Sequence, residues 1–390
     1  MRCTDVAIVG GGLAGSTTAA MLGRAGHAAL LVDPHPVYPP DFRCEKLDES
    51  QVRLMQQTGL ADSILPFGAR DGEVWVVRRG RLAEKRPSGR YGIMYDALVN
   101  RVRSAVPDGT IIHAKAAKIS NSADRQHIVL SNGEEISARL VVLANGLNVG
   151  MRQNLGIDRT VVSPCQSISI GFDLVPVGRD AFDFPALTYH PQNAKSRIAY
   201  LAIFPVASAM RANMFVYWDQ DDPRLRALRH EPEAALLALL PRLDRFLGPF
   251  RVSSVVKIRP VDLYVSTGMM QPGVVLVGDA CGTSCPAEGT GTNKVLTDVV
   301  RLCTRHIPNW LSTPGMPTEK IAEFYRDPVK QACDASSIHR AHFERALSTD
   351  LSVPWRARRV TRIVAQFGLG AVRAARSRWL DGRASRPAPA

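Results

Sequence analysis

Residues 273–298 decide the fold: Gly273-Val-Val-Leu-Val-Gly-Asp279-Ala-Cys-Gly-Thr-Ser-Cys-Pro286-Ala-Glu-Gly-Thr-Gly-Thr-Asn-Lys-Val-Leu-Thr-Asp298. Val274 to Val277 is an apolar, β-branched run with turn residues on both sides, so we predict a buried strand. The strand ends at Gly278-Asp279, where a carboxylate can leave the sheet edge and accept hydrogen bonds from ligand hydroxyls. From Thr292 onward, apolar residues recur at helical spacing. The stretch is therefore predicted to form a strand, a ligand-binding loop and a helix.

A second glycine-rich turn lies near the N-terminus. Asp5 to Val9 is predicted to form a strand, followed by Gly10-Gly11-Gly12-Leu13-Ala14-Gly15, a helix from about Leu13, and a strand from Ala28 to Val32 that ends at Asp33. In this G-x-G-x-x-G context the first glycine makes a tight turn, the second lets the backbone approach a pyrophosphate, and the third lets the helix pack on the strand. An acid at position 33 favours an unphosphorylated ribose, as in FAD or NAD.

Residues 278–298 resemble the second flavin motif of the FAD-dependent aromatic hydroxylase superfamily, which has the p-hydroxybenzoate hydroxylase fold. The family pattern falls on Gly278, Asp279, Ala280, Pro286, Gly289, Gly291, Asn293 and Asp298. The resemblance implies that Asp279 holds the ribityl chain of FAD and that Pro286 borders the isoalloxazine ring. It also implies that the backbone amides of Gly289, Thr290, Gly291 and Thr292 face the pyrimidine edge of the flavin, and Asn293 of the motif is a further predicted FAD-binding residue.

The resemblance extends to two further segments. Family members contact the FAD diphosphate or ribityl chain from the region that contains Arg43, which is our candidate for this role. A buried strand ends at Asn145-Gly146 and resembles the family's Asp-Gly motif, so both residues are predicted FAD contacts. Asn145 stands where the family has Asp, and this departure leaves open whether NADPH, NADH or a reductase partner supplies the electrons. Arg152 is expected to pair with the diphosphate or with a loop acid.

Composition excludes several classes of protein. The chain has 390 residues, of which 45% are hydrophobic, and no apolar run is long enough to span a membrane. Seven cysteines without regular spacing favour reduced thiols, and no His or Cys spacing predicts a metal site. The N-terminal apolar stretch contains Asp5 and a glycine cluster, which is not typical of a signal peptide. We expect a cytoplasmic protein with a small-molecule substrate, no metal and no nucleic-acid partner.

We predict an α/β fold with two lobes and a C-terminal helical region. The Rossmann-like FAD-binding lobe is expected to be discontinuous, at residues 1–70, 91–160 and 271–330. An antiparallel-sheet substrate lobe is expected at 71–90 and 161–270, and a basic helical region at 331–390. Eight aromatic residues of the second lobe are candidates for lining a pocket, although strand alternation lets at most half of them face it: Phe172, Phe184, Tyr189, Tyr200, Phe204, Phe215, Tyr217 and Trp218.

Local patterns predict several helices and a hairpin around these lobes. Helices are expected at Asp48–Thr58 and Tyr91–Val106, and a helix broken at Pro241 is expected over Glu233–Leu247. The runs at 74–77 and 81–85 are predicted to pair as a hairpin, and Ile111–Ile119 is predicted to be a strand.

The formal net charge of +13 is concentrated near the C-terminus, where residues 331–390 contain eleven arginines and four acids. From Trp355 to Leu380 an apolar stripe runs between arginines, with Trp355 and Trp379 at its ends. Such a helix either packs its stripe on the FAD lobe, which we favour, or lies on an anionic membrane surface. The second alternative would make the protein peripheral at a membrane.

The resemblance implies an FAD-dependent monooxygenase that hydroxylates or epoxidises an aromatic or lipid-like substrate. We name no catalytic residue, because the cofactor carries the chemistry. Two alternatives stay open, a flavin-dependent reductase of isoprenoid double bonds and a flavin-dependent halogenase. The segment Tyr200-Leu-Ala-Ile-Phe-Pro205 has no Trp where halogenases carry one, and Gly282 replaces the usual His of aromatic hydroxylases. The missing Trp argues against the halogenase, and Gly282, which isoprenoid reductases more often have at this position, favours a bulky or lipid-like substrate. A flavoprotein that has lost turnover and binds a partner or membrane is the non-enzymatic alternative.

Overall fold

The computed structural model describes residues 1–207 and 209–384, with side chains described up to residue 376. The chain divides into two compact units. The first unit consists of Met1–Gly68, Ile93–Gln166 and Val261–Ala341, and the second of Ala69–Gly92, Ser167–Pro260 and the chain from His342 onward. The basic region expected at 331–390 is thus divided between the two units.

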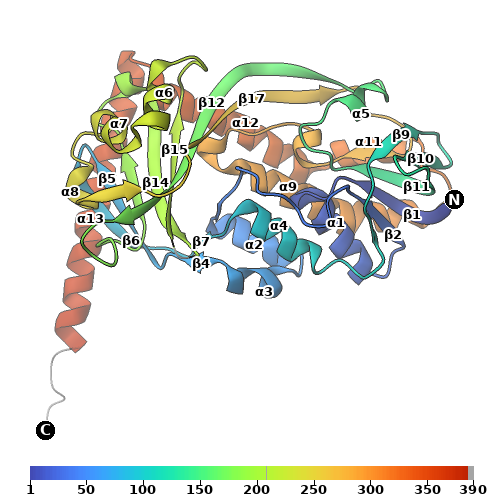
Figure 1. Ribbon diagram of the computed structural model, residues 1–390, viewed down its shortest axis with the longest axis horizontal. Coiled ribbons are helices and arrows are strands. Elements are labelled where there is room, and N and C mark those ends of the chain that lie inside the picture. Colours follow the sequence, from blue (N-terminus) through green and yellow to red (C-terminus); the bar gives the residue numbers. More distant parts are fainter. Residues whose placement is uncertain (208, 385–390) are drawn as a thin grey trace, which may run out of the picture. The chain divides into compact units, whose positions relative to one another are not determined.

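The first unit is built on a seven-stranded sheet (Figure 1), with strand order β8-β2-β1-β11-β10-β9 and β18 beside β11. β1, β2, β8, β11 and β18 run parallel, and β9 and β10 are antiparallel additions. Their bounds are β1 Arg2–Val9, β2 Ala29–Val32, β8 Ile111–Ile112, β9 Ala116–Ser120, β10 Gln126–Leu130, β11 Glu135–Leu143 and β18 Val274–Leu276. This is the predicted Rossmann-like sheet.

Helices cover one face of this sheet because alternate strand residues point to it. Ile8, Leu140 and Val275 pack on this face with apolar residues of α1, α2, α4 and α9. The helices of the unit are α1 Leu13–Arg24, α2 Glu49–Gln57, α3 Ala61–Ile64, α4 Tyr95–Arg103, α5 Gly150–Gln153, α9 Thr290–Arg301, α10 Ile307–Leu311 and α11 Thr318–Tyr325. α12 (Pro328–Thr349) begins in this unit.

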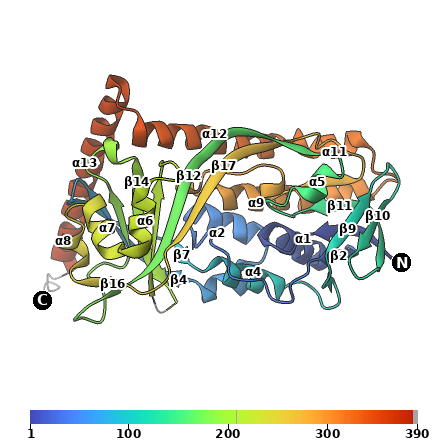
Figure 2. The ribbon, with the colours of Figure 1, turned by 45° about the horizontal axis from the view of Figure 1, so that its top comes forward.

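The second unit holds most of an eight-stranded sheet of order β16-β12-β15-β14-β13-β5-β6, with β17 beside β12. Along the order from β16 to β6 the pairs are antiparallel except β5 with β13, which is parallel. α6 Pro223–His230, α7 Pro232–Leu239 and α8 Asp244–Leu247 lie beside this sheet in Figure 2. The strands are β5 Glu73–Arg78, β6 Arg81–Pro87, β12 Asp158–Pro176, β13 Leu187–His190, β14 Ile198–Val206, β15 Ala209–Val216, β16 Phe250–Val252 and β17 Lys257–Thr267. The short β3 Lys46–Leu47, β4 Ala69–Arg70 and β7 Tyr91–Gly92 lie outside both large sheets.

Several predicted boundaries need correction. The helix expected from Tyr91 begins at Tyr95, because Tyr91–Gly92 forms β7. The strand expected at Ile111–Ile119 is two strands, β8 and β9. The helix after the flavin motif begins at Thr290, two residues before the apolar periodicity starts. The hairpin at 74–77 and 81–85 is confirmed, as β5 and β6 pair antiparallel.

The prediction that the C-terminal stripe packs on the FAD lobe is wrong for the residues with described side chains. α13 (Val353–Ala384) packs instead along β6 of its own unit. Val360, Val364 and Ala371 of the stripe are exposed, while Ile363 and Phe367 are half-buried. The side chain of Trp379, predicted to end the helix, lies outside the described residues.

Candidate cofactor site

In the turn from β1 into α1, Gly10 and Gly15 lie in close contact with neighbouring backbone, whereas Gly12 has open space beside it. Gly10 has a φ of 108°, and a Cβ there would lie 2.5 Å from the Ala144 carbonyl oxygen. A Cβ on Gly15 would collide with the Gly10 carbonyl oxygen. Gly12 is the N-cap of α1, and the nearest atoms to a Cβ at this position, on Tyr38 and Tyr95, are 3.9 Å away. The chain therefore leaves room beside Gly12 at the start of α1, where the first amides of a helix suit a pyrophosphate.

Asp33 lies at the end of β2, beside this turn, and is buried. Its Oδ2 accepts a 2.7 Å hydrogen bond from the Gly11 amide, and Arg103 Nη1 lies 3.3 Å from Oδ1. Arg103, on α4, also donates to the Gly11 carbonyl at 3.2 Å. Sequence reasoning missed Arg103, although a charged residue directly after Val102 on the apolar face of a helix was a usable signal.

Arg43 and Asp279 meet although they come from different segments of the unit. Arg43 Nη1 donates to Asp279 Oδ2 at 2.7 Å, and its Nε donates to Asp41 at 2.5 Å. Both Arg43 and Asp279 are about a quarter exposed, at 23% and 27% of their side chains, so a ligand can still reach them. A Cβ on Gly146 would lie 4.0 Å from Arg43 Nη2, so the predicted Asn145-Gly146 segment borders the same place.

Two tyrosines complete this cluster, and sequence reasoning named neither. Tyr38 and Tyr95 meet edge to face, with ring centroids 5.7 Å apart, and the Arg43 guanidinium lies 5.8 Å from the Tyr95 ring. Burial, together with the Asp41 carboxylate, raises the pKa of Tyr38 to about 12. Burial also raises the pKa of Tyr95. Both phenols therefore stay neutral near pH 7, and the Tyr38 hydroxyl donates to Asp41 Oδ2 at 3.4 Å.

A buried ion pair between Asp298 and Lys330 stabilises the Gly278-Asp279 turn. Gly278 has a φ of 62°, and its amide donates to Asp298 Oδ2 at 3.1 Å. Lys330 Nζ donates to the other oxygen of Asp298 at 2.8 Å, and each side chain of the pair is 2% exposed. Asp298 of the flavin motif thus stabilises the turn that positions Asp279.

The start of α9 is held by side chains, and its first backbone amides have no partner within the helix. Gln51 Nε2 donates to the Gly289 carbonyl at 2.6 Å and to Asn293 Oδ1 at 3.0 Å. Asn293 Nδ2 donates to Ser50 Oγ at 2.8 Å, and the hydroxyls of Thr290 and Ser337 are 2.7 Å apart. The side chain of Asn293 therefore ties α9 to α2. Pro286 opens the short turn that leads to Gly289, where φ is 66°.

The segment after β11 differs from what its motif suggests. Asn145 Nδ2 donates to the Asn148 carbonyl at 3.0 Å, while Oδ1 is buried and has no hydrogen-bond partner among the described residues. Arg152 is also buried and donates to neutral oxygens, including the Ala280 carbonyl at 2.5 Å and Ser266 Oγ at 2.9 Å. The expected pairing of Arg152 with a loop acid is therefore wrong, and its pairing with a diphosphate stays a prediction. Arg152 holds the chain directly after Asp279 instead.

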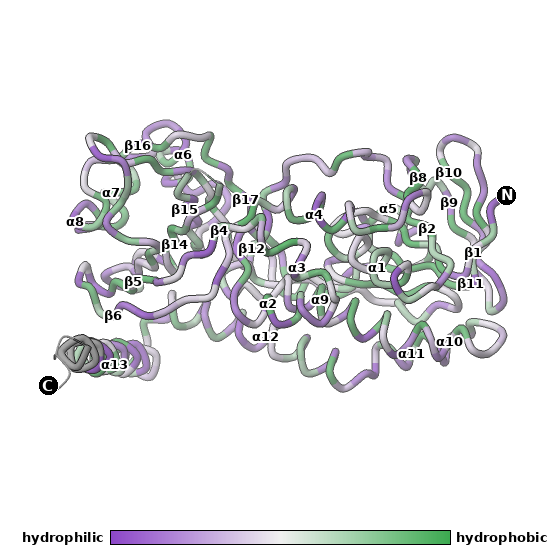
Figure 3. Tube along the Cα trace, turned by 90° about the horizontal axis from the view of Figure 1, so that it is seen from below, coloured by the Kyte–Doolittle hydropathy of each residue, from purple (hydrophilic) through white to green (hydrophobic). Residues whose placement is uncertain are grey.

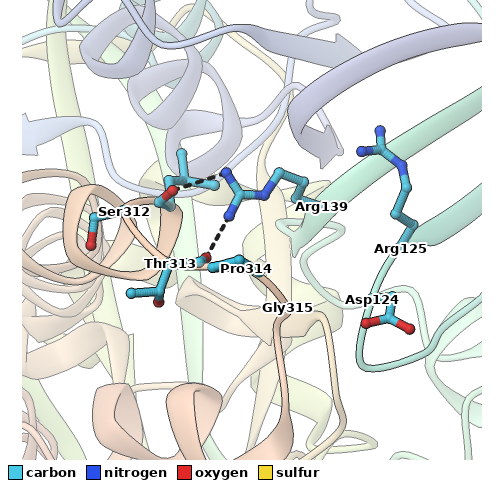
Figure 4. A pocket seen from close by; sticks show the side chains of 8 residues that line it. Asp124, Arg125, Arg139, Ser312, Thr313, Pro314 and Gly315 are labelled. Atoms are coloured by element: carbon cyan, nitrogen blue, oxygen red, sulfur yellow. Dashed lines mark hydrogen bonds between the residues drawn. The ribbon is translucent and has the colours of Figure 1, made fainter.

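These residues fit FAD by the chemistry of their donors and acceptors. Free helix amides and Arg43 suit two phosphates, Asp33 and Asp279 suit sugar and ribityl hydroxyls, and Gly12 leaves the space that a side chain would fill. No group of three or more metal-ligating side chains occurs within residues 1–207 and 209–376. A surface hollow of the same unit is lined by Arg125, Arg139 and the 311–315 turn (Figure 4), none of which is a predicted site residue.

A family model described as the FAD binding domain matches residues 3–307. The chain belongs to this family. It is 26% identical over 321 residues to the 3-demethoxyubiquinol 3-hydroxylase of Escherichia coli, covering 76% of this chain and 78% of that protein. It is 26% identical over 331 residues to the ubiquinone hydroxylase of Rhodospirillum rubrum, covering 78% and 72%. The menaquinone reductase of Mycobacterium tuberculosis is 29% identical over 163 residues, or 39% of this chain and 40% of that protein.

Solved structures show the same fold. The p-nitrophenol 4-monooxygenase of Pseudomonas putida superposes with a TM-score of 0.75 at 16% identity and 98% coverage of both chains. A flavin-dependent brominase superposes at 0.68 with 15% identity, covering 95% and 94%. At these identities the likeness concerns the fold alone. With the family and the curated relatives, the protein is an FAD-dependent oxidoreductase of the monooxygenase class.

Proposed function

We propose that this monooxygenase hydroxylates an aromatic or quinone-type ring that carries a lipid-like substituent. The names of the Escherichia coli and Rhodospirillum rubrum relatives support a substrate of this class. When bound, FAD supplies the activation of O₂, and the chain binds and orients the ring and keeps water away. The observation that carries the proposal is the composition of one face of the second unit's sheet.

The strand register separates the aromatic residues of this sheet onto two faces. Tyr189 points toward the helices, where its hydroxyl donates to the Pro241 carbonyl at 2.6 Å and its ring meets Phe246. Tyr200 pairs in register with Phe215, so both lie on the opposite face, with ring centroids 5.1 Å apart. The alternation expected from the sequence is therefore present, and the second face is the candidate for stacking on a substrate ring.

The same face offers hydrogen-bonding groups. Asn213 lies two residues before Phe215 and is buried, and its Oδ1 has no hydrogen-bond partner among the described residues. Arg211 follows the same alternation and is ion-paired to Asp173 at 3.0 Å. A hydroxyl group on the substrate ring could donate a hydrogen bond to Asn213 Oδ1. A buried acceptor without a hydrogen bond costs free energy, so this contact would be favourable. Aromatic rings beside a buried polar acceptor suit a hydroxylated ring better than a plain hydrocarbon.

The electron donor is part of the proposal. We propose NADPH or NADH, with a separate reductase partner as the alternative if neither reduces the bound flavin. Asn145, which stands where the family motif has Asp, is the reason that the alternative is kept. Because the proposed substrate would reside in a membrane, we also propose a peripheral contact with the bilayer.

Product analysis tests the function directly. The FAD-loaded protein is given a reductant, isotopically labelled dioxygen and a short-chain ubiquinol precursor, and the product is weighed by mass spectrometry. Incorporation of one labelled oxygen supports hydroxylation. A gain of two hydrogens without label would instead support the reductase alternative, which the partial similarity to menaquinone reductase favours. Asn213→Ala should raise KM, and Tyr189→Phe, on the other face of the sheet, is the matched control.

A further inference from the structure

Helix α13 turns its polar side toward its own unit. Gln366 accepts from Arg78 Nε at 2.7 Å and donates to Glu84 at 3.4 Å, and Arg373 forms an ion pair with the buried Glu84. Gly370 is buried against β6, where a Cβ would collide with the Ala83 carbonyl oxygen. Gln366, Gly370 and Arg373 therefore share, with the half-buried Ile363 and Phe367, the contact that an amphipathic helix usually makes with its apolar stripe alone.

Val360, Val364 and Ala371 of the predicted stripe belong to an apolar strip that faces outward. Residues spaced by three and four along α13 share one side of a helix. On the outward side these are Val353, Ala357, Val360, Val364, Gly368, Ala371, Val372 and Ala375, and all of them are exposed. Val353, Val364 and Val372 expose 75%, 65% and 66% of their surface. The stripe contains no charged residue over more than five helical turns.

Arginines border this outward stripe. Residues 353–376 contain six arginines and no acidic residue. By helical spacing Arg356 lies along one edge of the stripe, and Arg358 and Arg376 lie along the other. Figure 3 views α13 nearly along its axis and shows hydrophobic and hydrophilic residues on the same helix. An uncharged apolar strip with arginines along both edges is complementary to a surface that has negative groups outside and an apolar layer below them.

We propose that the outward face of α13 docks the protein onto an anionic lipid bilayer, with the helix lying in the plane of the membrane. The valines would enter the boundary between headgroups and acyl chains, and the arginines would contact anionic headgroups. No helix within residues 1–207 and 209–384 is long and apolar enough to cross a membrane, so the contact is peripheral. The biological purpose rests on the proposed lipid-like substrate, but the docking surface is argued from α13 alone.

A second copy of the chain is the less favourable occupant of this stripe. Two α13 helices packed stripe to stripe would bring their arginine rows together, and residues 353–376 provide no acidic residue to offset the repulsion. An anionic bilayer complements both features of the face at once. Self-association through this strip is the competing outcome, and the oligomeric state is therefore measured together with vesicle binding.

Vesicle co-sedimentation of the full-length, FAD-loaded protein tests the surface. Binding is measured with vesicles of phosphatidylcholine alone and with vesicles that also contain phosphatidylglycerol. We expect the wild-type protein to bind the anionic vesicles more tightly. The double variant Val360→Asp, Val364→Asp should bind them at least about tenfold more weakly, because each valine loses its burial in lipid. Val255→Asp in the same unit is the matched control, since Val255 is 82% exposed and lies outside α13.

A second variant makes the test independent of the valines. Arg356→Gln, Arg358→Gln, Arg376→Gln should lose the preference for phosphatidylglycerol while circular dichroism and flavin content stay unchanged. Equal vesicle binding by the wild-type protein and the valine variant would overturn the proposal. A change from dimer to monomer in the valine variant, seen by analytical ultracentrifugation, would also overturn it in favour of a second copy.

The outcome is separable from that of the proposed function. Turnover of a water-soluble, short-chain substrate should be the same in the wild-type protein and the valine variant, because α13 is not part of the cofactor site. Vesicle binding without hydroxylation of any such substrate would refute the function and leave the docking surface standing. Hydroxylation without vesicle binding would refute the docking surface and leave the proposed function standing.

Discussion

Arg43 and Asp279, 236 residues apart in the sequence, are joined by a 2.7 Å hydrogen bond between guanidinium and carboxylate. The bond links the loop after β2 to the turn after β18, which are two of the segments predicted to hold FAD. Neither side chain is fully buried, so the pair remains accessible to a ligand. We propose that this bond holds Arg43 and Asp279 in advance for contact with the cofactor.

Asp279→Asn should weaken FAD binding about 10- to 100-fold, because hydrogen bonds to charged groups contribute about 1.5–3 kcal/mol each. The variant should unfold at nearly the same temperature as the wild-type protein. Flavin fluorescence titration of the apoprotein measures the affinity. Arg53→Gln, an exposed change on α2 of the same unit, is the control and should leave the affinity unchanged. A wild-type affinity in Asp279→Asn would remove Asp279 from the site.

Gly12→Ala and Gly15→Ala should fail in different ways. A methyl group at position 12 meets nothing closer than 3.9 Å, so Gly12→Ala should fold normally but obstruct the dinucleotide. A methyl group at position 15 collides with the Gly10 carbonyl oxygen, so Gly15→Ala should be destabilised by about 1–3 kcal/mol. Thermal unfolding of the apoprotein and FAD titration separate the two effects. Normal FAD binding by Gly12→Ala would contradict the assigned path of the pyrophosphate.

The sequence was informative where a backbone position allows few residue types. Gly10 and Gly15 could be found because only glycine fits those close contacts, and the β-branched run before Gly278 could only be a buried strand. Arg103 and Tyr38 were missed because their roles depend on which segments meet in space. Helical periodicity predicted one apolar stripe on α13, but Val360, Val364 and Ala371 are exposed while Ile363 and Phe367 are half-buried. Periodicity alone, however, does not state which face of a helix a domain covers, and here Glu84 and Arg78 attract the polar face.

Lys330→Met should destabilise the protein by about 3–5 kcal/mol, because it leaves Asp298 as an uncompensated buried charge. Burial alone would lower the pKa of Lys330, but the carboxylates of Asp298 and Asp334 raise it well above its ordinary value. The lysine is therefore charged in the folded protein. The double variant Asp298→Asn, Lys330→Met should recover most of the loss, since an amide oxygen can still accept from the Gly278 amide. Urea unfolding measures the stabilities, and no recovery in the double variant would argue against the pair as the cause.

Protonation of Asp327 should reduce the stability of the folded protein at low pH. Burial alone would raise its pKa, but hydrogen bonds from Arg301, His306 and the first amides of α12 lower the pKa below its ordinary range. A carboxyl group with a lowered folded pKa contributes stability above its unfolded pKa of about 3.9, and this stability is lost as the pH falls through the folded pKa. Asp327→Asn should therefore lose about 2–3 kcal/mol at neutral pH.

The difference between the wild-type protein and Asp327→Asn should shrink as the pH is lowered below about 4. Urea unfolding at a series of pH values measures this difference. Burial lowers the pKa of His306 despite the nearby Asp327 carboxylate, so this imidazole adds a loss of stability that begins as the pH falls below about 6.5. A difference that stays constant across the acid range would show that Asp327 acts through its shape and not through its charge.

Asn145→Asp restores the acid of the family motif but should not restore any function linked to it. The amide of Asn145 donates to the Asn148 carbonyl, and a carboxylate at this position would lose the donor and face that oxygen. We expect a loss of about 1–3 kcal/mol in stability and no faster anaerobic bleaching of the flavin by NADPH or NADH. Asn154→Asp, an exposed change that follows α5, is the control. Faster bleaching in Asn145→Asp would instead mean that the natural Asn limits the use of a nicotinamide donor, and the wild-type protein would then depend on a reductase partner.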